Sequence, residues 1–122
     1  MVAPTRVLVV EDEPLIAMDI GVTLEELGLE VVGYAQTMDE AEEQICALAP
    51  DLVTLDVNLG KGREGLDIAA ALRAAGGIPI LFVTGQGERE IAEFARGLGH
   101  AAVALKPISA TVMERALSAL AA

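Results

Sequence analysis

The chain is poor in cysteine, in aromatic residues and in long apolar runs, and each shortage excludes a class of protein. One cysteine among 122 residues rules out a disulfide scaffold, and the apolar run around Cys46 predicts a small buried side chain. No run approaches the roughly 20 apolar residues of a membrane span. Aromatics make up only 2%, too few to stack the bases of a single strand. We therefore expect a cytoplasmic protein without a membrane span.

Basic residues are also scarce, because 8 Lys and Arg stand against 19 Asp and Glu, giving a formal charge of −11. Nucleic-acid backbones and anionic lipids attract dense basic surfaces, so we expect no direct binding to nucleic acid or to a membrane. Hydrophobic residues make up 53%, enough for one core at this length. The composition predicts a single domain over residues 1–122.

Short apolar runs alternate with amphipathic segments from one end of the chain to the other. Nearly continuous apolar runs are typical of strands that are covered on both faces. The predicted strands are residues 7–10, 31–35, 52–55, 80–83 and 102–105. Five predicted helices alternate with them, and boundary residues support three of these: Pro14 in a first turn, Thr37 with Glu40 as a capping box, and Ser109 as a cap.

This alternation predicts an α/β protein with a parallel sheet. Connections between parallel strands are right-handed, so helices cover both faces of the sheet only if the winding direction reverses once. The natural outcome is the flavodoxin-like (βα)5 doubly wound parallel sheet with strand order 2-1-3-4-5. Ligands of such sheets bind outside the carboxyl ends of the strands, at the reversal between the first and third.

Ionisable and hydroxyl side chains stand at those carboxyl ends. Glu11 and Asp12 follow the first strand, Asp56 the third, Thr84 the fourth and Lys106 the fifth. Carboxylates that converge within about 5 Å repel by about 3 kcal/mol per pair at an effective dielectric of about 20, so a cation is expected among them. Oxygen ligands favour Mg²⁺, because zinc prefers clusters of His and Cys, which this sequence lacks.

A carboxylate beside Mg²⁺, a hydroxyl and an ammonium are the groups needed to accept a phosphoryl group. In this hypothesis Asp56 is the nucleophile, Asp12 binds the metal and Glu11 assists through coordinated water. Thr84 and Lys106 each contact a phosphoryl oxygen. Positioning and charge neutralisation then supply most of the catalysis.

These residues resemble the receiver domain of two-component response regulators, and the resemblance covers essentially the whole chain. The matching motifs are Val9-Val10-Glu11-Asp12-Glu13, Leu55-Asp56, Thr84 and Lys106-Pro107. The resemblance implies that the backbone carbonyl of Asn58 completes the metal site. It also implies a sensor histidine kinase or phosphotransfer protein as phosphodonor, a protein target, and a switch with modest phosphorylation and dephosphorylation activity of its own.

The chain departs in places from the common pattern of this family. Most receivers carry an aromatic residue three positions before the lysine, where this chain has Val103, so the usual aromatic readout is absent. Residues 82–87 resemble instead the run of the subgroup nicknamed FATGUY, although Val83 replaces its alanine and the last two residues, Gln86 and Gly87, also depart. The sequence ends just after the last predicted helix, which predicts either action through protein contacts alone or a fragment of a longer protein.

Three alternatives remain open at this point. A phosphohydrolase of the haloacid dehalogenase type uses an aspartate nucleophile, but places it after the first strand with a second acid two residues on, whereas Asp56 follows the third strand and is followed by Asn58. A flavin carrier on the same sheet would need stacking aromatics that are scarce here. A pseudo-receiver would bind partners without phosphate.

Overall fold

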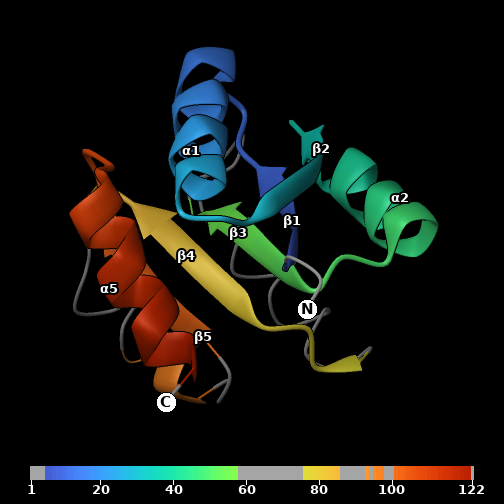
Figure 1. Ribbon diagram of the computed structural model, residues 1–122. Coiled ribbons are helices and arrows are strands. Elements are labelled where there is room, and N and C mark those ends of the chain that lie inside the picture. The colour runs from blue at the N-terminus through green and yellow to red at the C-terminus, as the bar shows by residue number, and fades with distance from the viewer. Residues whose placement is uncertain (1–4, 58–75, 86–92, 94, 98–100, 122) are drawn as a thin grey trace.

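Five parallel strands form one sheet at the centre of the molecule (Figure 1). The computed structural model describes residues 5–57, 76–85, 93, 95–97 and 101–121. The strands are β1 (Arg6–Val10), β2 (Glu30–Ala35), β3 (Leu52–Asp56), β4 (Ile80–Thr84) and β5 (Ala101–Leu105). Their order is β2-β1-β3-β4-β5, and every neighbouring pair is parallel, which confirms the predicted doubly wound topology.

Helices cover both faces of this sheet. Helices α1 (Pro14–Glu26) and α5 (Ala110–Ala121) lie on one face, and α2 (Met38–Leu48) lies on the other (Figure 1). Most of the segments in which the sequence predicts the third and fourth helices lie outside the described residues. The three described helices are enough to show that the winding reverses between β1 and β3.

Alternate residues of each strand face opposite layers, as expected for the pleat of a strand. In β1, Val7 and Val9 pack in the cluster with α1 and α5, whereas Leu8 and Val10 pack in the cluster with α2. All four are at most 1% exposed, so the strand is buried on both sides. This double burial explains the continuous apolar run in the sequence.

The helix boundaries agree with the predicted caps, with one difference. Pro14 begins α1. The Thr37 hydroxyl accepts a hydrogen bond from the N–H of Glu40 at 3.1 Å, and the Ser109 hydroxyl accepts one from the N–H of Val112 at 3.2 Å. The Glu40 carboxylate, however, accepts from the N–H of Gln36 at 2.9 Å rather than from that of Thr37. The predicted capping box therefore closes one residue further upstream.

The prediction that Cys46 is buried is wrong, because its side chain is exposed on α2. The apolar face of α2 packs against the sheet through Ala41 and Ile45. Each residue of an α-helix is turned by about 100° from the one before, so a side chain directly after Ile45 leaves that face.

Among the described residues, no helix has the length and apolar character needed to span a membrane.

Candidate functional site

The acidic residues at the carboxyl ends of β1 and β3 occupy neighbouring positions because these two strands pair directly. The chain leaves β1 at Glu11, whose N–H donates to the carbonyl oxygen of Ala35 at 2.9 Å and so stays in register with β2. Asp56 is the last residue of β3. The topology thus delivers the carboxylates to one edge of the sheet, at the reversal point that the sequence indicated.

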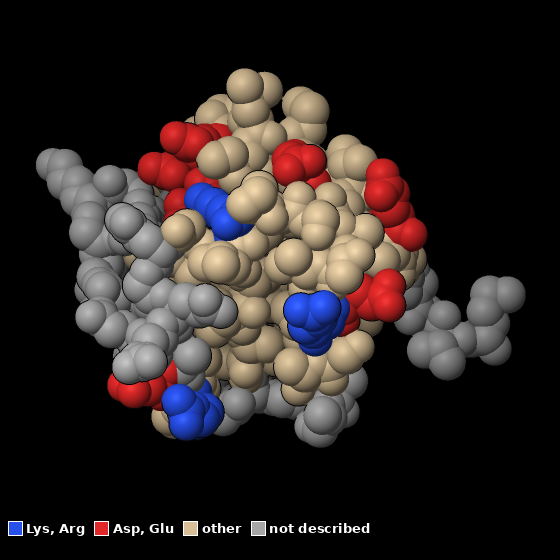
Figure 2. All heavy atoms as spheres, turned by 90° about the vertical axis from the view of Figure 1, so that its left-hand side faces the viewer, with Lys and Arg blue, Asp and Glu red and all other residues tan. Residues whose placement is uncertain are grey.

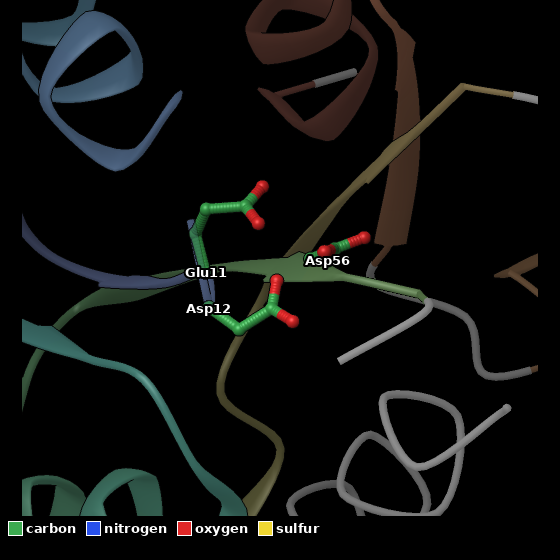
Figure 3. Close-up of side chains that lie close together, drawn as sticks. All are labelled: Glu11, Asp12 and Asp56. Carbon is green, nitrogen blue, oxygen red and sulfur yellow. The ribbon is translucent and has the colours of Figure 1, made fainter. Parts of the chain in front are cut away.

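Three carboxylates converge there, from Glu11, Asp12 and Asp56 (Figure 3). One oxygen of each lies within 4.8 Å of the others. Glu11 is only 1% exposed and Asp56 only 5%, so these two carboxylates are largely withdrawn from water, whereas Asp12 lies at the solvent side of the cluster. Buried like charges at such separations need a compensating cation.

Lys106, which follows β5, supplies one positive charge to the acidic cluster. Its Nζ lies 3.2 Å from Glu11 Oε1 and 3.8 Å from Asp56 Oδ1. The backbone N–H of Lys106 donates to the carbonyl oxygen of Thr84 at 2.7 Å, which holds the chain after β5 against β4. The peptide bond between Lys106 and Pro107 is cis. The lysine therefore contacts two of the three carboxylates that the sequence analysis grouped with it.

Thr84 is the last residue of β4 and is fully buried. It lies at the same edge of the sheet, because β4 pairs with β3 on one side and with β5 on the other. Val103 stands where most receivers carry an aromatic residue. It is partly buried in β5 and packs against the core on the α2 side of the sheet. Asn58, the remaining predicted metal residue, lies outside the described residues, as do Gln86 and Gly87.

The pKa of Glu11 is raised from 4.5 to about 7, and burial is the largest cause. Hydrogen bonding to Asp56, the charge of Asp56 and a hydrogen bond to Asp12 also raise this pKa. The positive charge of Lys106 acts in the opposite direction. A single lysine thus falls short of neutralising the acidic cluster, and Glu11 carries a proton for part of the time near neutral pH.

The donor set fits a hard divalent cation. Its members offer carboxylate oxygens only, which suit Mg²⁺ rather than zinc. Glu11 Oε1 is buried, and within the described part of the chain no hydrogen bond satisfies it, although Lys106 Nζ is its ion-pair partner. A buried acceptor with spare capacity is what a hydrated cation would engage. Asp12 and Asp56 are the residues expected to bind the ion directly.

A pocket that the sequence analysis missed adjoins the acidic cluster between α1 and the end of β2. It encloses about 270 Å³ and is lined by Glu11, Pro14, Ala17, Met18, Tyr34 and Gln36. Its lining is mostly apolar, apart from Glu11 and Gln36. The hydrophobic pattern of α1 gave no signal for this pocket, because apolar residues occur on the solvent side of that helix as well as on its core side.

Similarity to known proteins agrees with this architecture. The chain is 41% identical to the transcriptional regulatory protein PdtaR of Mycobacterium tuberculosis over 106 residues, which cover 87% of the chain and 51% of PdtaR. It is 40% identical to the phyllosphere-induced regulator PhyR of Methylorubrum extorquens over 86 residues, 70% of the chain and 32% of PhyR. The chain thus spans about half the length of PdtaR and about a third of PhyR.

A solved structure gives the same answer at the level of the fold. The solution structure of the receiver domain of PhyR from Erythrobacter litoralis superposes with a TM-score of 0.80 at 28% identity, covering 98% of this chain and 91% of that domain. The sequence also matches the response regulator receiver domain over residues 7–118, which include every residue of the candidate site. The chain therefore belongs to the receiver domain family of response regulators.

Proposed function

We propose that this receiver domain accepts a phosphoryl group on Asp56 and passes the signal on through contacts with other proteins. One observation carries the proposal: Asp56 is nearly buried, lies beside two other carboxylates and faces the ammonium of Lys106 at 3.8 Å. A structural ion pair needs one acid for one base. Three converging acids around one lysine instead provide a nucleophile, cation ligands and a group that neutralises the transferred charge.

In this proposal an oxygen of Asp56 attacks phosphorus, an acyl phosphate forms, and the bond from phosphorus to the nitrogen of the donor breaks. The released nitrogen takes up a proton. Lys106 Nζ holds its charge beside Asp56 before and after the transfer, so it offsets part of the charge that the phosphoryl group brings. The Thr84 hydroxyl, at the end of the adjacent strand, is assigned to a phosphoryl oxygen.

Asp12 and Asp56 would hold Mg²⁺, with Glu11 acting through coordinated water and the backbone carbonyl of Asn58 completing the ligand set. Bound there, the ion would offset the negative charge shared by the carboxylates and the incoming phosphoryl group. The protein residues position the acceptor, exclude water from it and supply the ammonium. Glu11 has to lose its proton before it can assist the ion, because a neutral carboxyl attracts the water around a cation less strongly than a carboxylate does.

The proposed phosphodonor is a sensor histidine kinase or a phosphotransfer protein. The proposed location of the chain is the cytoplasm, where such donors present phosphohistidine. Residues 1–122 form one receiver unit in this proposal. Membership of the FATGUY subgroup is part of the proposal, supported by Phe82 and Thr84 at the end of β4 and by Gly85 directly after it.

The test is to incubate the chain with Mg²⁺ and phosphoramidate, a small phosphodonor with a nitrogen leaving group, and to measure intact mass. We expect one added phosphoryl group in the wild type and none in Asp56→Asn. Asp51→Asn is the matched control, because Asp51 lies at the opposite end of β3 and should leave labelling unchanged.

Other outcomes would contradict the proposal in distinct ways. No labelling of the wild type would favour a pseudo-receiver that binds partners without phosphate. Rapid release of inorganic phosphate from many phosphoesters would favour the phosphohydrolase. Labelling that survives in Asp56→Asn would remove Asp56 as the acceptor.

A further inference from the structure

A hollow, here called the β5 hollow, lies beside the edge strand β5 of the sheet. It encloses about 500 Å³ and is lined by residues of β5, by residues of α5, and by Ala95 and Arg96. Pockets that take up small organic molecules have volumes of about 300–1,000 Å³, so the β5 hollow has the size of a ligand site. It shares no described lining residue with the acidic cluster.

Most of the lining of the β5 hollow is apolar. Val103 and Leu105 of β5 and Val112 of α5 contribute to it, and its other uncharged residues are all alanines. Leu105 is 38% exposed, and Val103 and Val112 are only partly buried. The short alanine side chains leave the space between them unfilled, so apolar surface remains in contact with water. Covering this surface with an apolar group would be favourable.

Two arginines line the same hollow, Arg96 and Arg115 of α5. Both are exposed, and neither forms an ion pair or hydrogen bond with another residue that the structure describes. The chain has only 8 basic residues against 19 acidic ones, and no acid is among the described lining residues of the β5 hollow. Figure 2 faces the side on which Figure 1 shows α5, and basic side chains stand there at the border of a wide uncharged area.

We propose that the β5 hollow binds a small amphiphilic anion, a molecule with an apolar body and one carboxylate. The apolar body covers Val103, Leu105 and Val112. The carboxylate accepts hydrogen bonds from the guanidinium groups of Arg96 and Arg115, because the planar fork of N–H donors in arginine matches a carboxylate. This site goes beyond the proposed function, since it does not involve the phosphoryl acceptor.

The charge of the whole chain favours a small anion over a large one. A formal charge of −11 repels nucleic acid, anionic membranes and acidic proteins, which present many negative charges at once. A single carboxylate beside two arginines gains their attraction and adds only one negative charge. A second copy of the chain, bound through the same surface by a two-fold axis, would bring the arginines of both copies together.

The test titrates the wild type with decanoate, below the concentration at which decanoate forms micelles. Isothermal titration calorimetry gives the affinity, and NMR spectra of the ¹⁵N-labelled chain show where binding occurs. We expect one site, with shifts at the amides of Leu105, Arg115 and Ala119. Octanoate should bind about tenfold more weakly, because two buried CH₂ groups are lost. Decyltrimethylammonium, which has the same alkyl chain and the opposite charge, should not shift these amides.

Two pairs of variants test the charged and the apolar part of the site. Arg115→Gln should weaken decanoate binding by about tenfold or more, because a hydrogen bond to a charged group is lost. Ala47→Glu changes the net charge by the same amount on the exposed side of α2 and should leave binding unchanged. Ala119→Phe fills the β5 hollow from an exposed lining position and should abolish binding. Ser118→Phe adds the same ring at the preceding exposed position, outside the described lining, and should stay within about twofold of the wild type.

The remaining outcomes overturn the proposal. Absence of saturable decanoate binding, or equal binding of decyltrimethylammonium, would remove the anion site. Equal loss in Arg115→Gln and Ala47→Glu would trace binding to net charge alone. A wild-type dimer in sedimentation that Ala119→Phe dissociates would assign the β5 hollow to a second copy. Circular dichroism checks that each variant folds, and Arg115→Gln, a change at an exposed side chain, decides the matter if Ala119→Phe does not fold.

Discussion

Among the residues that the structure describes, Glu11 has the most strongly raised pKa. Its carboxyl is buried beside Asp56 and Asp12, and its pKa is about 7 instead of 4.5. The folded state therefore holds a proton on Glu11 that the unfolded state has already released, over the range between these two pKa values. Burial of this acid lowers the free energy of unfolding as pH rises through that range, by up to about 3 kcal/mol.

From this we predict that Glu11→Gln is more stable than the wild type near pH 8, by about 1–3 kcal/mol, and that the difference shrinks toward about pH 5. The reason is that glutamine is neutral at both values, whereas Glu11 is charged only at the higher one. Urea unfolding without divalent cations at several pH values measures it. Glu42→Gln on the exposed side of α2 is the control, and the same pH dependence in both variants would contradict the prediction.

The residues of the site could be named from the sequence because strand ends in a parallel sheet share one edge. Their individual environments could not. The burial of Glu11 and its ion pair with Lys106 depend on how tightly α1 and the segment after β5 close over the site, which no local pattern encodes. Cys46 shows the same limit, since an apolar neighbourhood in the chain did not reveal on which side of α2 the thiol lies.

At the scale of elements, α2 packs against β2 through a close approach at Gly33. A Cβ at this position would overlap Gln44 Oε1 and lie 2.9 Å from Leu48 Cδ1 and 3.3 Å from Leu8 Cδ1. The register between β1 and β2 shifts just before this point, so the backbone of Gly33 is brought toward the helix. The absence of a side chain lets α2 cover the sheet edge.

We predict that Gly33→Ala destabilises the fold by about 1–3 kcal/mol, because Leu8 and Leu48 have to move apart to admit the methyl group. Gly76→Ala is the matched control, since an added Cβ there meets no atom within 4 Å. Chemical denaturation of both variants at one pH gives the comparison. An equal effect of the two changes would mean that α2 adjusts without cost.

The strands were the elements most fully predictable from sequence. Each of the five observed strands includes its whole predicted range and is one residue longer. The extra residue is polar or small, as with Glu30 and Asp56, so the hydrophobic pattern does not include it. It still belongs to the strand, because backbone hydrogen bonds to the neighbouring strand do not depend on the side chain. Hydrophobic pattern marks the buried centre of a strand and cannot mark where pairing stops.

For the molecule as a whole, the acidic cluster couples stability to divalent cations and to pH. We predict that millimolar Mg²⁺ stabilises the wild type, by about 3 kcal/mol when its concentration is about 100 times the dissociation constant. The stabilisation should be greater near pH 8 than near pH 6, because protons on Glu11 oppose the cation. Thermal unfolding followed by circular dichroism measures it.

The controls separate binding from general screening of a chain with a charge of −11. NaCl at the same ionic strength should produce a smaller shift, EDTA should reverse the shift due to Mg²⁺, and Asp12→Ala should abolish it. Equal shifts in Asp12→Ala and the wild type would take Asp12 out of the site. Asp19→Ala, which changes the net charge by the same amount on the exposed side of α1, should respond as the wild type does.

The position of Tyr34 has a practical consequence. The chain has one tyrosine and no tryptophan, so this ring dominates its ultraviolet emission, and excitation above the absorption of its two phenylalanines selects it. The ring lines a pocket that also includes Glu11, and it stands half in solvent beside α1. The molecule thus carries a built-in fluorophore at its acceptor edge, and events there can be followed in real time without attaching a dye.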